Sequence, residues 1–293
     1  MKKMKTIIGM LMLLMPSCAF SQGFQIQSKE LLDAPFTSRE RNVLDTALIK
    51  IYYQLDFKKD STSDECTQAQ TILLAGDRCL MFGDYFYVKL DSLAFIWEKE
   101  KRKFGEVFPQ MVELMNMKKY DTKIVCDLLE KKTICRESPT KEIYQYEEPT
   151  PEINWTILEG DSIINDYPCG KAACRYRGRD YIAWYAKDIS IPLGPYLFHG
   201  LPGLIFMIKD TKDNFRFTLN GLENQTNDND LIYLEISNLT IKNSREKVRA
   251  TIKKNFDNPL EVLLQDPRIR ISKETLAKKP NRKPRPYNPM ELE

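Results

Sequence analysis

The sequence predicts a mainly β protein with a few helices, in the α+β class, built on a curved antiparallel sheet or half-barrel. Apolar and polar residues alternate strictly over 49–57, which is the pattern of a half-buried strand. Gly76-Asp77 separates two apolar runs and Arg177-Gly178 separates another pair, which is typical of hairpins. The 293 residues are 42% hydrophobic and 29% charged, so the chain is neither mostly disordered nor a multi-span membrane protein.

The remaining elements follow from the same periodicities. In chain order, strands are predicted at 49–57, 71–75, 78–82, 123–126, 132–135, 168–177, 181–185, 204–208, 215–219 and 231–236. Amphipathic helices are predicted at 91–104 and 108–117, and a third after Ser244, where Val248, Ile252 and Phe256 share one stripe. We therefore divide the chain into a signal peptide (1–21), a single β-rich domain (22–267) with a helical insertion near 91–117, and a C-terminal tail (268–293).

The first residues have the pattern of an export signal. Lys2, Lys3 and Lys5 precede an apolar run that is too short to span a bilayer, and Ala19 and Ser21 place small residues before a cleavage site. A lipoprotein signal with Cys18 as the lipidated residue is the alternative, which Pro16 disfavours. Cleavage after Ser21 leaves basic and acidic residues in equal number, so bulk charge gives no reason to expect nucleic-acid binding. We expect the protein in the periplasm or on the periplasmic face of the outer membrane.

Cysteine usage agrees with an oxidising compartment. Six cysteines remain after the signal, and an even number predicts up to three disulfides of undetermined connectivity: Cys66, Cys79, Cys126, Cys135, Cys169 and Cys174. If the turn near Glu130 has two residues, Cys126 lies opposite Cys135. The spacings do not pair as in zinc sites.

The segment Ser190–Gly203 is unusually rich in Pro and Gly, which make up six of its fourteen residues. Leu201–Leu204 has the pattern of a type II turn, with Pro202 at the second position and Gly203 accepting a positive φ. Gly200 would let the main chain pass close to another element. We infer that backbone geometry and apolar packing shape this segment.

Several motifs give the chain a resemblance to a known family. The hexapeptide Gly200–Ile205 is the signature of the GLPGLI family of exported Bacteroidota proteins. Trp155, Tyr167, Cys169, the run 177–179, the run 183–185, Ile191-Pro192 and Gly194–Tyr196 stand in the order that family shows, and the ending 288–292 is similar to the family's C-terminal close. The resemblance implies export and a curved antiparallel sheet of the lipoprotein-carrier kind, with no settled activity and no agreed catalytic residues. The resulting motif and candidate interaction loop comprises Gly194, Pro195, Tyr196, His199, Gly200, Leu201, Pro202, Gly203, Leu204 and Ile205.

Few residues have the pattern of a catalytic or metal site. His199 is the single histidine, which argues against a Ser-His-Asp enzyme and a multi-histidine metal centre; we interpret it as a loop or rim residue. Met111, Met115 and Met117 have the spacing of core residues rather than of a soft-metal site. Asp161, Asp166 and Asp180 lie near predicted turns, where salt bridges account for them. We predict no catalytic residue, cofactor or metal ligand.

Aromatic residues and the tail are the better candidates for binding. Tyr181, Trp184 and Tyr185 lie on one strand, whose side chains alternate between two faces, so some of them face away from the core unless both faces are covered. They either pack within the sheet or contact an apolar ligand or another protein. Residues 268–285 hold eight basic residues and one acid, with prolines that disfavour regular structure. This tail is either solvated or a docking arm for an acidic partner or a membrane surface.

Together these features favour a non-enzymatic envelope protein that binds a lipid-like ligand or an envelope protein through its curved sheet and the Ser190–Gly203 loop. A carboxylate-dependent envelope hydrolase is the alternative, and it requires at least two acids in one pocket with perturbed titration. Metal (copper) handling through Met and Cys is a weaker third hypothesis.

Overall fold

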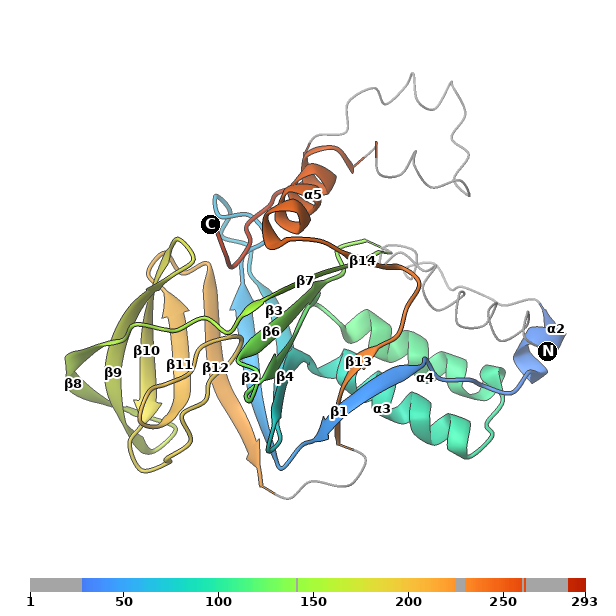
Figure 1. Cartoon of the computed structure of the whole chain (residues 1–293), viewed down its shortest axis with the longest axis horizontal. Helices are drawn as coiled ribbons and strands as arrows, with labels where there is room; N and C mark the ends of the chain where they lie inside the picture. Colours follow the sequence, from blue (N-terminus) through green and yellow to red (C-terminus); the bar gives the residue numbers. More distant parts are fainter. Residues whose placement is uncertain (1–27, 141, 225–229, 260, 262–283) are drawn as a thin grey trace.

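The computed structural model describes residues 28–140, 142–224, 230–259, 261 and 284–293 (Figure 1). The predicted signal peptide, with Cys18, lies outside these ranges, as do residues 268–283 of the predicted tail. Within the described ranges, no helix combines the length and the apolarity needed to cross a membrane.

One large sheet dominates the molecule. Its strand order is β14-β7-β6-β5-β4-β3-β2-β12-β11-β10-β9-β8, and every pairing is antiparallel except the parallel pair of β14 with β7. The strands are β2 (Ile49–Phe57), β3 (Thr67–Ala75), β4 (Cys79–Asp84), β5 (Thr122–Asp127), β6 (Lys132–Glu137), β7 (Ile143–Pro149), β8 (Thr156–Ile164), β9 (Tyr167–Tyr176), β10 (Arg179–Ala186), β11 (Leu204–Asp210), β12 (Phe215–Glu223) and β14 (Thr240–Lys242). β8 and β14 lie at opposite ends of the order, so the sheet is open (Figure 1).

A second, small sheet and four helices complete the described structure. β1 (Arg41–Thr46) pairs antiparallel with β13 (Leu231–Glu235). The helices are α2 (Lys29–Asp33), α3 (Tyr85–Lys99), α4 (Phe104–Met117) and α5 (Arg245–Asp257). Figure 1 shows α3 and α4 side by side near one end of the sheet and α5 near the C-terminal residues. The predicted mainly β, α+β class is confirmed.

Three hydrophobic clusters hold these layers together. The largest covers one face of the sheet from β5–β7 to β9–β12 and includes Tyr53, Tyr181, Phe217 and the buried Met290 of the last residues. A second lies between α3, α4 and the segment around Phe36. The third packs the opposite face of β3–β5 against β13 and α3. Burial on both faces explains why strands of this part read as apolar runs rather than as alternating patterns.

One buried aspartate explains why the first long helix begins earlier than predicted. Asp84 ends β4 and accepts hydrogen bonds from Phe86 N (2.9 Å) and Tyr87 N (3.2 Å), which makes it the N-cap of α3. Its second oxygen accepts from Lys119 N (2.9 Å) and Tyr120 N (3.1 Å). The same carboxylate therefore fixes the start of the helical pair and the return of the chain to β5.

The predicted disulfides are not present. All six cysteines in the described part of the chain are free thiols, and five of them are buried. The β5–β6 hairpin forms as predicted, but its loop has four residues because Asp127 Oδ1 accepts from Leu129 N and Glu130 N, both at 3.0 Å. Cys126 therefore faces Thr133, and Cys135 faces Ile124. The two thiols are not cross-strand partners.

Candidate functional site at the C-terminal residues

The central residues of the Ser190–Gly203 loop are buried. Tyr196, Phe198 and Leu201 are buried in the main cluster, together with Leu204 and Ile205 at the start of β11. Gly200 N donates to Pro192 O and Ile205 N donates to Leu193 O, both at 3.0 Å, so the loop closes on itself before it enters β11. This segment is a packed part of one sheet face.

The structure reverses the predicted roles of the two loop glycines. Gly203 does not have a positive φ, so the predicted type II turn is wrong. A Cβ on Gly203 would lie 1.9 Å from Ala186 O, which makes this residue the site of close main-chain approach. Gly200 has φ +91° and open space around it, so its conformation requires glycine. Tyr196 also has a left-handed φ, of +60°.

His199 lies at the rim of the loop, in the position that we predict for it from the sequence. Its Nε2 is 3.1 Å from Pro151 O, and its own carbonyl accepts from Trp155 Nε1 at 2.8 Å. Both contacts join the loop to the segment that precedes β8. Pro195 is buried and Pro202 is exposed.

The three candidate aromatic residues of β10 divide between the two sheet faces. Tyr181 and Tyr185 are buried, 1% and 5% exposed, in the main cluster, whereas Trp184 points to the other face and is half-buried beside Lys171. Tyr181 packs its ring 4.7 Å from Phe198 of the loop, centroid to centroid. Two of the three residues are thus core residues and offer no exposed apolar contact.

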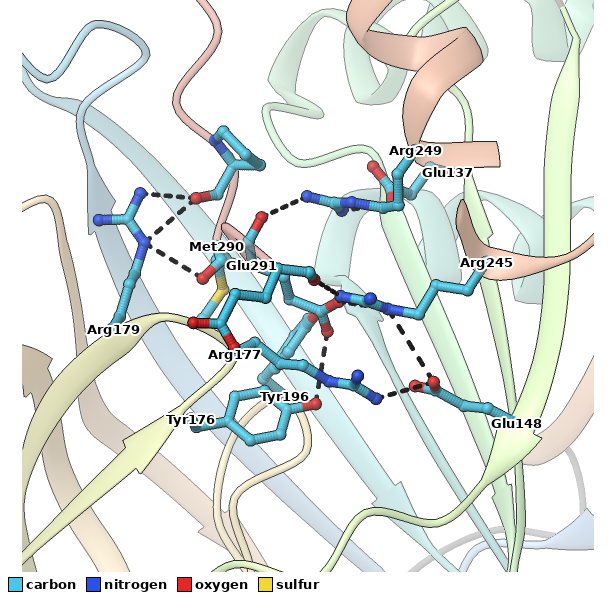
Figure 2. A network of polar contacts seen from close by, with 12 residues as sticks. Glu137, Glu148, Tyr176, Arg177, Arg179, Tyr196, Arg245, Arg249, Met290 and Glu291 are labelled. Carbon is cyan, nitrogen blue, oxygen red and sulfur yellow. Dashed lines mark hydrogen bonds and ion pairs between the residues drawn. The ribbon is translucent and has the colours of Figure 1, made fainter. Parts of the chain in front are cut away.

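Several residues of the motif resemblance contact the end of the chain. We call Asn288–Glu293 the C-terminal segment. Arg179 Nη2 donates to Pro289 O (2.6 Å) and to Asn288 Oδ1 (2.6 Å), and Arg179 Nε donates to Met290 O (3.1 Å). Leu292 N donates to Arg177 O at 2.9 Å. The segment is therefore held by its main chain against the β9–β10 turn (Figure 2).

Two side chains of this segment enter the protein. Met290 is 6% exposed and lies within hydrogen-bond distance of Tyr120, with Oη 3.5 Å from the sulfur. Glu291 is 1% exposed, and its Oε1 accepts from Tyr196 Oη at 2.6 Å while its Oε2 accepts from Arg245 Nη2 at 2.5 Å. A buried carboxylate with charge-assisted bonds on both oxygens is strongly ordered.

Further charged groups surround Glu291 (Figure 2). We call Tyr176, Arg177, Arg179, Tyr196, Arg245 and Arg249 the C-terminal site. Arg249 Nη2 donates to Glu291 O at 2.5 Å, and Arg249 Nη1 lies 3.1 Å from Glu137 Oε1. Arg177 pairs with Glu148 at 2.8 Å, and Arg245 lies 3.9 Å from that carboxylate. Each carboxylate of this cluster is therefore paired with at least one guanidinium group.

Burial sets the titration of this cluster. Desolvation raises the pKa of Glu137 against the effect of Arg249, and it raises the pKa of Glu148 against the effect of Arg177. Burial likewise raises the pKa of Tyr196 well above its usual value, so its hydroxyl remains a hydrogen-bond donor to Glu291. One oxygen of Glu148, Oε1, is buried without a partner.

Motifs in the sequence include some of the residues of this site. The motif resemblance includes Arg177, Arg179, Tyr196 and the ending 288–292, and the structure brings all of them together. Arg245, Arg249, Glu137 and Glu148 carry no motif and were not predicted. No pattern in the sequence marks these four residues. Cationic partners for Glu291 follow only from its burial, which the structure shows, because a buried carboxylate requires an opposite charge. Residues 284–286 are exposed, as the hypothesis of a solvated tail predicts, whereas Met290 and Glu291 at the end of the chain are buried against the protein's own core.

A second buried ionic cluster joins the small sheet to the large one. Glu235 of β13 pairs with Lys123 at 2.8 Å and with Arg136 at 2.9 Å. Burial raises the pKa of Glu235, but the two cations overcome this effect and lower it to about 2. Among the described residues, no group of three or more His, Cys, Asp or Glu side chains is placed to hold a metal ion.

The edge strand β8, which lies beside β9, carries exposed apolar residues. It pairs with β9 on one side and is a terminal strand of the sheet (Figure 1). Ile157 is 57% exposed and Ile163 is 79% exposed, and Tyr167 at the start of β9 is 43% exposed. A register shift between Leu158 and Ser162 places a bulge in the middle of the strand.

Comparisons with known proteins leave the family open. No family model and no curated protein sequence matches this chain. Two solved structures of PNGF-II, in space groups P21 and C2, are similar, with 12% and 11% identity and TM-scores of 0.43 and 0.42. The alignments cover 73% and 71% of this chain and 34% and 33% of those chains, so the chain spans about a third of PNGF-II. This distant likeness says nothing about activity.

Proposed function

We propose that the protein is a non-catalytic exported protein of the GLPGLI group, which binds another protein of the cell envelope at the free edge of β8. The observation that carries this proposal is the exposure of Ile157 and Ile163 on a nine-residue terminal strand. A free strand edge presents unpaired main-chain N–H and C=O groups, and an extended partner segment adds to it as a further strand.

The bulge of β8 gives the partner a preferred chemistry. Glu159, Gly160 and Asp161 lie within the register shift, and Asp161 is paired with Lys187 at 2.8 Å. If two copies of β8 paired antiparallel about Gly160, Glu159 would face Asp161 of the other copy, and the like charges would repel each other. The edge therefore disfavours self-association and favours a partner strand with a basic residue between apolar ones.

A lipid-like ligand has less support. Such a ligand needs an open apolar face, whereas the Ser190–Gly203 loop and Met290 pack on one face of the sheet and bury Tyr181 and Tyr185. The finer expectation of a lipoprotein-carrier fold rests on the same open face, and it stays a hypothesis. Membership of the GLPGLI group rests on the motifs and on their convergence at the C-terminal site.

One observation favours the hydrolase alternative. Glu137 and Glu148 lie in one cluster with Glu291, and burial raises the pKa of the first two. However, each of these carboxylates is paired with an arginine, and their side chains are only 16%, 13% and 0% exposed. A general acid needs contact with substrate, so this arrangement supports a structural role better than catalysis.

The test of the proposal uses paired variants of exposed residues. Ile163→Lys changes the edge of β8, and Leu129→Lys is its matched control, because Leu129 is 75% exposed in the β5–β6 loop. We expect the wild-type protein and L129K to capture the same envelope protein, and I163K to lose it at unchanged stability. A photo-crosslinking residue at position 163 should label an extended segment of that partner. Equal capture by all three proteins, or labelling of lipid alone, would contradict the proposal.

A further inference from the structure

The C-terminal segment is bound in the manner of a separate peptide. Four of its carbonyls, at residues 289, 290, 291 and 293, accept hydrogen bonds from Arg179, Arg249 and Arg245. Two consecutive side chains are buried, Met290 within the main hydrophobic cluster and Glu291 between the Tyr196 hydroxyl and the Arg245 guanidinium. Peptide-binding proteins combine the same two features, main-chain contacts for affinity and side-chain pockets for specificity.

The groups that bind the segment belong to elements held in place by other contacts. Arg179 is paired with Tyr176 across the β9–β10 hairpin and also contacts Asp210, with Nη1 3.3 Å from the carboxylate. Tyr196 lies in the loop closed by the bridge between Leu193 and His199. Arg245 and Arg249 lie on α5, which is anchored to the main cluster by Val248 and Ile252. These elements are thus held in place by contacts of their own in addition to those with the segment.

The covalent connection lies apart from the recognition contacts. Arg285 N donates to Phe256 O at 2.8 Å, and the Tyr287 ring lies 4.9 Å from the Phe256 ring, centroid to centroid. The chain thus returns to the end of α5 close to the point where it left that helix. A covalent connection between two neighbouring points raises the effective concentration of the segment at the site.

We propose that the C-terminal site is a peptide-binding site and that it binds the C-terminal segment of a second copy of this chain in trans. The second copy supplies the same Met-Glu pair and the same main-chain acceptors, so each contact described above forms equally well between two chains. In the intact chain the segment competes with its counterpart at an effective concentration on the order of millimolar. Exchange between copies therefore follows when the connection is cut, as by a protease of the envelope.

The test begins with the intact, folded chain. A protease recognition sequence is inserted between Thr275 and Leu276, the purified protein is cut, and the fragment that begins at Leu276 is followed by size-exclusion chromatography. We expect the fragment to remain with the body at micromolar concentration and to exchange with a labelled fragment from a second preparation. Circular dichroism reports in parallel whether the body stays folded.

Two labelled fragments test recognition of the segment itself. Glu291→Gln removes the charge that Arg245 and Tyr196 bind, so we expect its affinity for the cut body to fall about tenfold or more. Leu292→Ala is the matched control, because the Leu292 side chain is 56% exposed, and it should bind like the natural fragment. Loss of the fragment after cutting, its retention without exchange, unfolding of the body as it leaves, or equal binding of E291Q would each overturn the proposal.

Discussion

Replacing Glu291 with glutamine changes one atom at the centre of the C-terminal site. Glutamine keeps the volume of the side chain and one oxygen that can accept from Tyr196 Oη, but it removes the negative charge that faces Arg245 at 2.5 Å. The Glu291 side chain is fully buried and the Arg245 side chain is 11% exposed, so water cannot replace the lost charge. We expect the E291Q protein to fold less stably.

The size of the effect follows from the geometry. Removing one partner of a buried ion pair costs about 3–5 kcal/mol, because the remaining charge is left uncompensated. Here Glu148 lies 3.9 Å from Arg245 and partly compensates it, so we expect the lower end of that range, about 3 kcal/mol. A natural domain is stable by about 5–15 kcal/mol, so E291Q should fold but unfold at clearly lower denaturant concentration.

Urea unfolding followed by tryptophan fluorescence and by circular dichroism measures this difference. Glu293→Gln is the control, since it removes the same charge two residues away, where the side chain is 68% exposed; its effect should stay within about 0.5 kcal/mol. An E291Q protein within 0.5 kcal/mol of wild type would refute the reasoning, because the buried carboxylate would then contribute nothing to the fold.

Three further predictions concern backbone, charge and thiols. Gly203→Ala should abolish accumulation of folded protein, because the new Cβ would meet Ala186 O. Gly200→Ala should lower the free energy of unfolding by only about 1–2 kcal/mol, because alanine is strained at the left-handed φ of this residue. Soluble yield and urea unfolding distinguish the two variants, and a larger effect of Gly200→Ala than of Gly203→Ala would contradict the assigned roles. The pKa of Glu235 is lowered to about 2 in the folded protein, so its contribution to stability is present above about pH 4.5 and is lost as the pH falls towards 2. The difference in unfolding free energy between wild type and Glu235→Gln should therefore shrink over that interval, and a constant difference would argue against the ion pairs. A thiol reagent should modify Cys66 alone in a folded chain that begins at residue 22 and all six cysteines after unfolding in denaturant without reductant; fewer reactive thiols would reveal disulfides.

Local pattern was sufficient for most of the sheet. The strict alternation of β2, the Gly76-Asp77 turn and the apolar run at the start of β11 each depend on neighbouring residues, and each element formed where it was predicted. The β5–β6 register depended on Asp127, whose side chain caps the loop and lengthens it, so the facing residues shifted by two. The start of α3 depended on Asp84, a residue that lies outside the strands and helices predicted from the sequence.

Only the residues of the C-terminal site that belong to motifs were singled out from the sequence. Arg179, Tyr196 and Glu291 were singled out in separate segments. No local pattern indicates that Arg179 binds the carbonyl of Pro289 or that Tyr196 binds the carboxylate of Glu291. The same lack of long-range information made Tyr181 and Tyr185 candidates for exposed contact, because alternation along β10 does not show that a loop covers one face. Arg245 and Arg249 lie on an ordinary amphipathic helix, and only the fold shows what they bind.

The central claim is that the motif loop serves to hold the C-terminal segment, and a double-mutant cycle tests it most directly. Tyr196→Phe removes only the hydroxyl that donates to Glu291 at 2.6 Å, and its free energy of unfolding is measured in the wild-type and the Glu291→Ala backgrounds. Hydrogen bonds to charged groups contribute about 1.5–3 kcal/mol, so we predict a coupling energy of at least about 1 kcal/mol. Additivity within about 0.5 kcal/mol would show that the loop and the segment do not depend on each other, and the account would be wrong.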